Sequence, residues 1–267
     1  GLGFALWCGR GLRSAAAAPV ANVTLLASAV NPCIFTSVVL PTSPPFSTTI
    51  PPCGQITALT VALGGGVGGA SRLYFADGGN SKVWWCDWIG TPCNPVSSFS
   101  AAMQGLTLLE LPSVGPLLVL GRSTSVAVYT APTATSPTSS LLATLSAQAV
   151  ADLLPPSSPP ATSVSTNRLG ISLAAVDDVT CDGIPDVVVG ADHYSTTPSH
   201  TGEVWVLVMA ANGTVAGARL LTPSVPIWKL GRGVGVWRGG GGKLWAMATS
   251  TDTTTTTKAL YFVPLQP

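Results

Sequence analysis

Proline and glycine interrupt this sequence so often that long helices have little room to form. The 267 residues include 29 glycines and 23 prolines, which break the chain roughly every ten residues into short segments rich in β-branched and aromatic side chains. Helical periodicity is hard to find in these segments. The sequence therefore predicts an all-β protein.

One pair of strands recurs along the chain, and five copies of it are visible. The copies read "FALWCGRG" and "NVTLLAS", "RLYFADGG" and "KVWWCDW", "PLLVLGRS" and "SVAVYTA", "DVVVGADH" and "EVWVLVM", and "LWAMATS" and "ALYFVPL". Their uneven periods of roughly 40 to 70 residues are typical of propeller blades with variable outer loops. Three copies add an upstream strand with Leu-Gly, at Leu63-Gly64, Leu169-Gly170 and Leu230-Gly231.

We expect a single β-propeller domain over residues 1–267, built from about five units of three to four antiparallel strands. The units lie near residues 1–55, 56–102, 103–160, 161–225 and 226–267. The first unit lacks its innermost strand and the last lacks its outermost strand, so either the ring closes imperfectly with five blades or the chain is part of a longer protein. A two-sheet sandwich is the alternative that the pattern leaves open.

The low charge and the distribution of hydrophobic residues argue against nucleic-acid binding and against a transmembrane segment. Charged residues make up 9% of the chain and the formal net charge is +1, so there is no basic surface to attract nucleic acid. The hydrophobic content is 46%, but no run of about twenty apolar residues occurs. We therefore expect neither nucleic-acid binding nor a transmembrane segment in this chain.

Several features indicate an extracellular or cell-surface glycoprotein. The chain has six cysteines, two glycosylation sequons at Asn22 and Asn212, and long Ser/Thr/Pro tracts, a combination that favours an oxidising compartment and covalent glycans. Cys86 with Cys93 is the first expected disulfide, and Cys33 with Cys53 is the second. The pairing of the other cysteines stays open, because six cysteines allow fifteen connectivities.

The acidic residues of the chain are concentrated in one place. Five of the eleven carboxylates, Asp177, Asp178, Asp182, Asp186 and Asp192, fall within sixteen residues. Counted from Asp178, the sequence D-V-T-C-D-G-I-P-D has oxygen-bearing side chains at positions 1, 3, 5 and 9 and glycine at position 6, a spacing typical of calcium ligands. We expect Ca²⁺ to be bound by the side chains of Asp178, Thr180, Asp182 and Asp186 and by the carbonyl oxygen of Ile184.

This stretch resembles the FG-GAP repeat of the propellers of integrin α-subunits. Leu169-Gly170 stands at the place of Phe-Gly, residues 178–186 at the place of the calcium loop, and Gly190-Ala191-Asp192 at the place of Gly-Ala-Pro. The resemblance implies an integrin-like propeller whose loops bind partners on one face. The corresponding loops of neighbouring units consist largely of glycine, and we expect them to bind no metal.

Catalysis is not expected. The carboxylates outside the loop are scattered singly, whereas acid and base catalysis needs facing pairs. His193 and His200 are the only histidines; they could form a zinc site with Asp192, but we expect them in an exposed loop that joins two strands.

The sequence thus predicts a calcium-binding, glycosylated adhesion or protein-interaction module, with other extracellular proteins or copies of itself as partners. A structural subunit of an extracellular filament or cell-wall layer, assembled through strand edges, is the alternative. A carbohydrate-binding propeller is a weaker alternative, based on the eight tryptophans, since aromatic side chains can stack on sugars.

Overall fold

The structure is a computed structural model that describes thirteen segments of the chain. They are residues 34–35, 48–49, 56–62, 72–78, 81–87, 94–98, 103–122, 124–132, 138–155, 168–196, 199–221, 229–251 and 258–265. Within them the protein is all-β, with four antiparallel sheets and one further pair of short strands. The helical elements of these segments are short, α1 (Ala147–Ala151) and a 3-10 turn at Gly240–Gly242.

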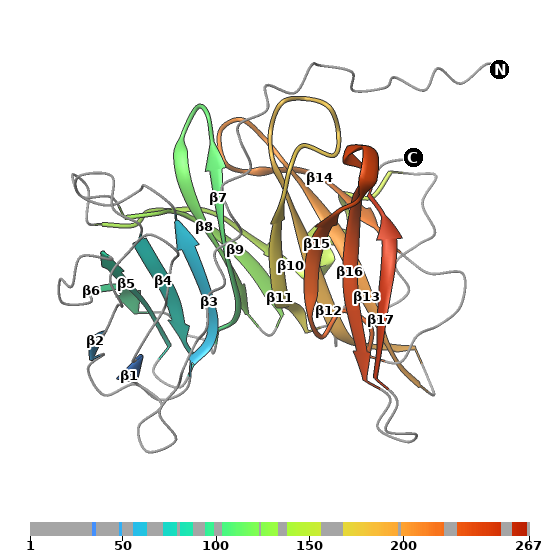
Figure 1. The fold of residues 1–267 in the computed structure, drawn as a ribbon, viewed down its shortest axis with the longest axis horizontal. Coiled ribbons are helices and arrows are strands. Elements are labelled where there is room, and N and C mark those ends of the chain that lie inside the picture. The colour runs from blue at the N-terminus through green and yellow to red at the C-terminus, as the bar shows by residue number, and fades with distance from the viewer. Residues whose placement is uncertain are drawn as a thin grey trace.

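Each sheet is a meander in which strands follow one another in chain order (Figure 1). Sheet I consists of β3 (Ile56–Ala62), β4 (Arg72–Asp77), β5 (Lys82–Asp87) and β6 (Asn94–Ser98). Sheet II consists of β7 (Met103–Leu111), β8 (Gly115–Arg122), β9 (Ser125–Thr130) and β10 (Leu141–Ser146). Sheet III consists of β11 (Leu169–Val176), β12 (Asp186–Thr196), β13 (Ser199–Met209) and β14 (Val215–Leu220). Sheet IV consists of β15 (Val234–Arg238), β16 (Leu244–Thr251) and β17 (Lys258–Pro264). The short pair is β1 (Ile34–Phe35) and β2 (Thr48–Thr49).

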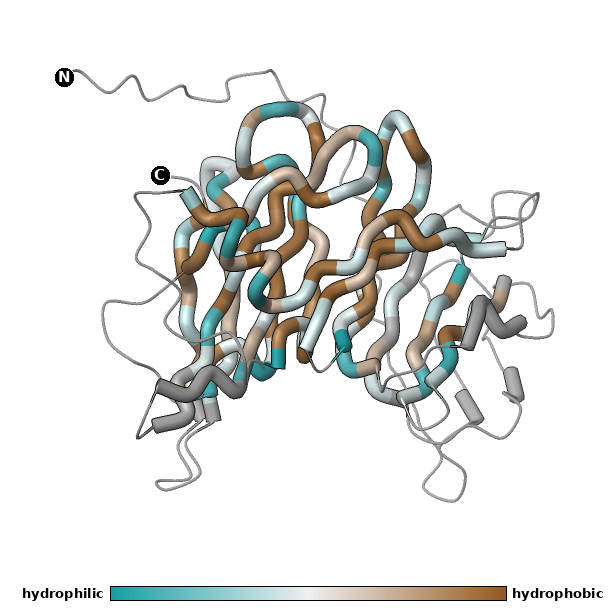
Figure 2. The backbone as a smooth tube through the Cα atoms, turned by 180° about the vertical axis from the view of Figure 1, so that it is seen from behind, coloured by the Kyte–Doolittle hydropathy of each residue, from teal (hydrophilic) through white to brown (hydrophobic). Residues whose placement is uncertain are grey.

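The middle strands have apolar residues at successive positions where the sheets on both sides cover them. In β12, Val187 and Val189 belong to the core between sheets II and III, whereas Val188 belongs to the core between sheets III and IV. Alternate residues of a strand point to opposite faces, so each middle sheet needs hydrophobic residues at successive positions. Figure 2 shows this pattern, with hydrophobic residues concentrated along the strands.

The four sheets pack face to face in series. Separate hydrophobic cores join sheet I to sheet II, sheet II to sheet III, and sheet III to sheet IV. The first strands of consecutive sheets also contact one another, in the order β3, β7, β11 and β15. Across the described segments this series forms no closed ring, and a two-sheet sandwich is wrong because four sheets are present.

The first expected unit, residues 1–55, lies outside the described residues except for β1 and β2. The last sheet has three described strands. The expected loop around His193 and His200 is wrong, because β12 and β13 continue as a paired hairpin in which Ser195 lies opposite His200.

Candidate metal loop and sheet junctions

The acidic loop joins the first two strands of sheet III. It begins after Val176, the last residue of β11, and ends at Asp186, the first residue of β12. Gly183 has a φ of 85°, a left-handed conformation that glycine adopts without steric cost. A Cβ at this position would meet no atom within 4 Å, so backbone conformation and not space favours glycine here.

Asp178 organises the loop through its carboxylate. Its Oδ1 accepts backbone N–H bonds from Thr180 at 3.0 Å, Cys181 at 2.6 Å and Asp182 at 3.2 Å. Its Oδ2 accepts the N–H of Gly183 at 2.6 Å, and the Thr180 hydroxyl lies 3.3 Å from Oδ1. The loop therefore curls around one carboxylate, as Asp does in tight turns.

Asp186 fixes the end of the loop from inside the protein. The residue is fully buried, and its two carboxylate oxygens accept the N–H groups of Val179 and Met209, each at 3.0 Å. Burial raises the pKa of Asp186 to about 6, and the charges of Asp182 and Asp178 add to this, although the two backbone N–H bonds act in the opposite direction. A nearby cation would stabilise the ionised form of this buried carboxylate, which also senses the charges of Asp182 and Asp178.

The other expected ligands lie along the same loop. Thr180 and Asp182 are exposed, and Asp182 Oδ1 accepts the N–H of Ile184 at 2.9 Å. Ile184 is half-buried against the core between sheets II and III. The loop thus has oxygen donors of the type that Ca²⁺ prefers, but among the described residues no three His, Cys, Asp or Glu side chains gather into a group that could hold a metal ion.

Neighbouring elements hold the loop and leave one side open. Asp177 forms an ion pair with Arg238 of β15, which ties the loop to sheet IV. A cleft of about 440 Å³ lies beside the loop, and Glu110 of β7 borders it together with Asp177 and Asp178. Burial raises the pKa of Glu110.

The cysteine predictions are tested only in part by the described residues. Cys86 and Cys181 are both disulfide-bonded. Cys93, Cys33 and Cys53 lie outside the described residues, so the expected pairs of Cys86 with Cys93 and of Cys33 with Cys53 stay predictions.

Of the two sequons, Asn22 lies outside the described residues, and Asn212 is exposed in the turn between β13 and β14. The Asn212 side-chain oxygen accepts the backbone N–H of Thr214 at 3.0 Å and its hydroxyl at 2.7 Å. A glycan on Asn212 would therefore project from a hairpin turn without entering a core.

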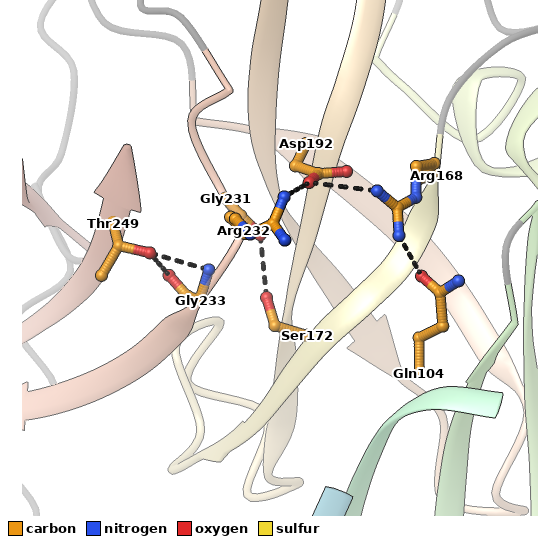
Figure 3. Close-up of polar contacts among 8 residues, drawn as sticks. All are labelled: Gln104, Arg168, Ser172, Asp192, Gly231, Arg232, Gly233 and Thr249. Carbon is orange, nitrogen blue, oxygen red and sulfur yellow. Dashed lines mark hydrogen bonds and ion pairs between the residues drawn. The ribbon is translucent and has the colours of Figure 1, made fainter. Parts of the chain in front are cut away.

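Asp192 lies in a charged cluster where sheets II, III and IV meet (Figure 3). Its fully buried carboxylate pairs with Arg168 at 3.5 Å and with Arg232 at 3.3 Å. Arg168 also donates to Gln104 of β7 at 3.0 Å. The two arginines and Gln104 thus link three sheets through this carboxylate. The sequence had suggested Asp192 as a possible zinc ligand with His193 and His200, and it did not predict these ion pairs.

Glycines from successive sheets touch where the Leu-Gly pairs occur. A Cβ on Gly170 would lie 2.6 Å from the Cα of Gly121 in β8, and a Cβ on Gly231 would lie 3.1 Å from the Cα of Gly190 in β12. Ser172 Oγ donates to the Gly231 carbonyl at 2.8 Å, as Figure 3 shows. The Leu-Gly pair therefore permits close backbone approach between neighbouring sheets, a role that the sequence reasoning missed.

The two leucines of these pairs complete the junctions. Leu169 and Leu230 are buried, in the cores on the two sides of sheet III. Leucine thus fills the core while the adjacent glycine lets the backbones approach. The repeated dipeptide could have indicated this role from sequence, because a glycine next to a buried residue often marks close backbone packing.

No helix in the described segments is long and apolar enough to cross a membrane. The chain has no significant match among curated proteins. Residues 169–207, which span β11, the acidic loop, β12 and most of β13, match the FG-GAP repeat family. Sheet III therefore contains an FG-GAP repeat, consistent with a repeat of an integrin-like propeller.

Proposed function

We propose that this protein is an extracellular adhesion or protein-interaction module built as a β-propeller of FG-GAP repeats. The match of residues 169–207 to that family is the observation that carries the proposal. Further support comes from the four meanders packed in series with their first strands in contact. Such packing suits blades arranged around an axis.

The propeller serves as a rigid scaffold for binding, and we assign it no catalysis. The carboxylates of Asp178 and Asp186 are engaged in backbone hydrogen bonds. Loops on a rigid scaffold are common binding surfaces, and the expected partners are other extracellular proteins or copies of this chain. The exposed position of Asn212 leaves this sequon accessible to glycosylation, as the proposed extracellular location would require.

Calcium belongs to the proposal as a structural ion of the acidic loop. Asp178, Thr180, Asp182 and Asp186 would supply side-chain oxygens, and Ile184 would supply its carbonyl. The ion would neutralise the repulsion that Asp182 and Asp178 exert on Asp186. Because Asp178 already curls the loop around itself, binding requires a local rearrangement that gathers the other oxygens.

Asp182→Asn tests the calcium assignment with little other change. Asparagine keeps a side-chain oxygen for the N–H of Ile184 and removes one charged ligand. We expect this variant to melt at a lower temperature than the wild type in millimolar calcium and at an equal or slightly higher temperature in chelator, because removing the charge relieves repulsion.

Asp152→Asn is the matched control for this comparison. Asp152 is exposed at the end of α1, away from the loop, and accepts a hydrogen bond from Gln148 at 2.7 Å. Its substitution should have the same effect with calcium and with chelator. If Asp182→Asn also gives equal shifts in both conditions, the loop binds no calcium.

A direct binding experiment tests the interaction module itself. The wild-type chain is immobilised and exposed to extracellular proteins in calcium and in chelator. Capture of a defined protein by a monomeric chain supports the proposal. A chain that captures nothing and instead forms filaments at rising concentration contradicts it.

A structural filament subunit is the second candidate, favoured by the edge of sheet IV. Strand β17 pairs with β16, and the described residues give it no second neighbour. An open edge can accept a strand from another copy. Filaments seen by electron microscopy that depend on this edge would favour the candidate.

The sugar-binding alternative has less support. Trp84, Trp85 and Trp205 are buried, so they cannot stack on a sugar. Trp237 is 48% exposed, and retention on a glycan array that a Trp237→Ser variant loses would be the result in favour of this alternative.

A further inference from the structure

Cys181 lies in the middle of the acidic loop. It is the fourth of the nine residues 178–186 and stands between Thr180 and Asp182, two of the expected calcium ligands. Cys181 is exposed, and its sulfur is part of a disulfide. The disulfide therefore restrains the same short segment that would supply oxygen atoms to the ion.

The backbone at Cys181 has a conformation that residues with a side chain rarely adopt. Its φ is 68°, in the left-handed region that favours glycine. In this conformation the Cys181 N–H donates to Asp178 Oδ1 at 2.6 Å. The N–H groups of Asp182 and Gly183 donate to the same carboxylate at 3.2 and 2.6 Å. A restraint at Cys181 thus helps to keep the loop closed around Asp178.

The disulfide of Cys181 can be reached by solvent at this residue, whereas the disulfide of Cys86 cannot be reached at Cys86. Cys86 is fully buried in β5 of sheet I, opposite Leu73 of β4. Reduction begins when a thiolate attacks a disulfide sulfur, so its rate depends on access to that sulfur. A soluble thiol can therefore approach Cys181 directly, and burial blocks its approach to Cys86.

We propose that the disulfide at Cys181 is a redox-sensitive restraint that sets the calcium affinity of the acidic loop. This inference rests on the proposed binding of calcium by the loop. In the oxidised protein the restraint holds Cys181 in the left-handed conformation and keeps the loop closed around Asp178. In the reduced protein Cys181 is free to leave that conformation, and the affinity for calcium falls.

The reductant is a soluble thiol. Its thiolate attacks one sulfur of the disulfide, which forms a mixed disulfide and releases one protein thiolate. A second thiol of the reductant then displaces the remaining protein sulfur. The protein thereby gains two electrons and two protons as two thiols, and the reductant becomes a disulfide.

The restraint favours calcium binding for a conformational reason. Each conformation of the loop that does not bind the ion lowers the apparent affinity, because it holds part of the population away from the binding form. The disulfide excludes such conformations and contributes no ligand itself. Since Cys181 gains free energy by leaving the left-handed region, loss of the disulfide should raise the Kd for calcium about tenfold.

Calcium titration of the full 267-residue chain by calorimetry tests the inference. The oxidised protein, the protein reduced with dithiothreitol and the protein reoxidised afterwards are compared. Peptide mapping by mass spectrometry should show that Cys181 becomes a free thiol before Cys86 does. Hydrogen exchange of β12 should stay slow throughout, which shows that sheet III remains folded. We expect the tenfold loss of affinity on reduction and its recovery on reoxidation.

Three variants separate the conformation of Cys181 from the presence of a disulfide. Cys181→Ala should bind calcium about tenfold more weakly than the oxidised wild type. Cys181→Gly should bind more tightly than Cys181→Ala, because glycine adopts a positive φ without steric cost. Cys86→Ala is the matched control, since it removes a disulfide from sheet I, and it should leave the affinity unchanged.

Several results would overturn the inference and leave calcium binding in place. They are an equal Kd for the oxidised and reduced protein, an equal Kd for Cys181→Ala and Cys181→Gly, and an equal loss of affinity in Cys86→Ala. Reduction of Cys86 before Cys181 would also overturn it. An oxidised, folded chain that binds no calcium would instead contradict the calcium site of the proposed function, and the inference with it.

Discussion

Individual glycines set how closely neighbouring sheets approach. Gly170 has a φ of 89°, and a Cβ there would collide with the Cα of Gly121 at 2.6 Å. Gly115 has nearly the same φ, 85°, but a Cβ there would meet no atom within 4 Å. The two positions therefore separate the cost of backbone conformation from the cost of close packing.

Gly170→Ala should be much more destabilising than Gly115→Ala. The left-handed conformation alone costs a non-glycine residue about 1 kcal/mol, and both variants share this cost. The backbone collision should add about 2 kcal/mol or more to the loss for Gly170→Ala. Urea unfolding of both variants measures the difference, and equal losses would show that the sheets do not approach closely at this junction.

A single buried residue, Glu203, makes the stability of the protein depend on pH. Burial raises the pKa of Glu203 to about 7, although the hydrogen bond from Trp205 Nε1, at 3.1 Å, acts in the opposite direction. Because the folded state holds this proton more tightly than the unfolded state, the contribution of Glu203 to stability falls as pH rises from about 4.5 to about 7.

Glu203→Gln should therefore stabilise the protein at pH 8 and have little effect at pH 4. Glutamine keeps an acceptor for Trp205 and cannot ionise. The gain at pH 8 should be about 3 kcal/mol, measured as the difference in unfolding free energy between the variant and the wild type at each pH. A gain that is the same at both pH values would show that Glu203 ionises normally in the folded protein.

The sequence predicted the acidic loop at residue level but not the role of Asp192. Spacing alone identified Asp178, Asp182 and Asp186 as members of one loop. Residues that bind a metal in a tight turn, or cap its backbone, lie within a few positions of one another in the sequence. The partners of Asp192 are Arg168 and Arg232, which lie 24 and 40 positions away in the chain. Without the register of the strands, no pattern indicates that these side chains meet.

At the scale of strands, the recurring pairs were easier to recognise than the strands that flank them. Strand β7 was missed because it carries Gln104-Gly105 in place of Leu-Gly. Gly105 nevertheless packs like the others, since a Cβ there would lie 2.6 Å from the carbonyl oxygen of Gly170. Close approach of two sheets requires a small residue at this position. The leucine that precedes it in the other units serves a different purpose, which is to fill the hydrophobic core.

Asp192→Asn should weaken the contacts between sheets more than Asp177→Asn does. Asp192 is fully buried between two arginines, whereas Asp177 is exposed in its pair with Arg238. Removing the buried charge takes away the partner of two arginines, which are themselves partly exposed, and should cost about 1 to 2 kcal/mol. The exposed pair should contribute less than about 1 kcal/mol.

Thermal unfolding of the two variants at low and high salt measures both effects. The loss for Asp177→Asn should shrink in high salt, because exposed charges are screened. The loss for Asp192→Asn should persist. Equal and salt-sensitive losses would show that Asp192 is not a buried link between the sheets.

For the whole molecule, composition and repeats predicted the class of fold better than its closure. Frequent proline and glycine predicted an all-β chain, and the described residues are four antiparallel sheets. Whether a series of sheets closes into a ring depends on contacts between units far apart in sequence. Such contacts leave no local pattern, so five blades were inferred from counting repeats and not from any residue that joins the ends.

Calcium should stabilise all four sheets together if they unfold as one unit. An ion that binds only the folded state at 100 times its Kd adds about 2.7 kcal/mol, which for a protein of this size raises Tm by roughly 5 to 10 °C. The cores between consecutive sheets share strands, since β8 contributes Leu118 to the first core and Val119 to the second. Hydrogen exchange should therefore slow in β4 of sheet I as well as in β12 when calcium is added. If calcium slows exchange only in sheet III, the sheets open independently, and the FG-GAP repeat is then a separately stabilised unit within the chain.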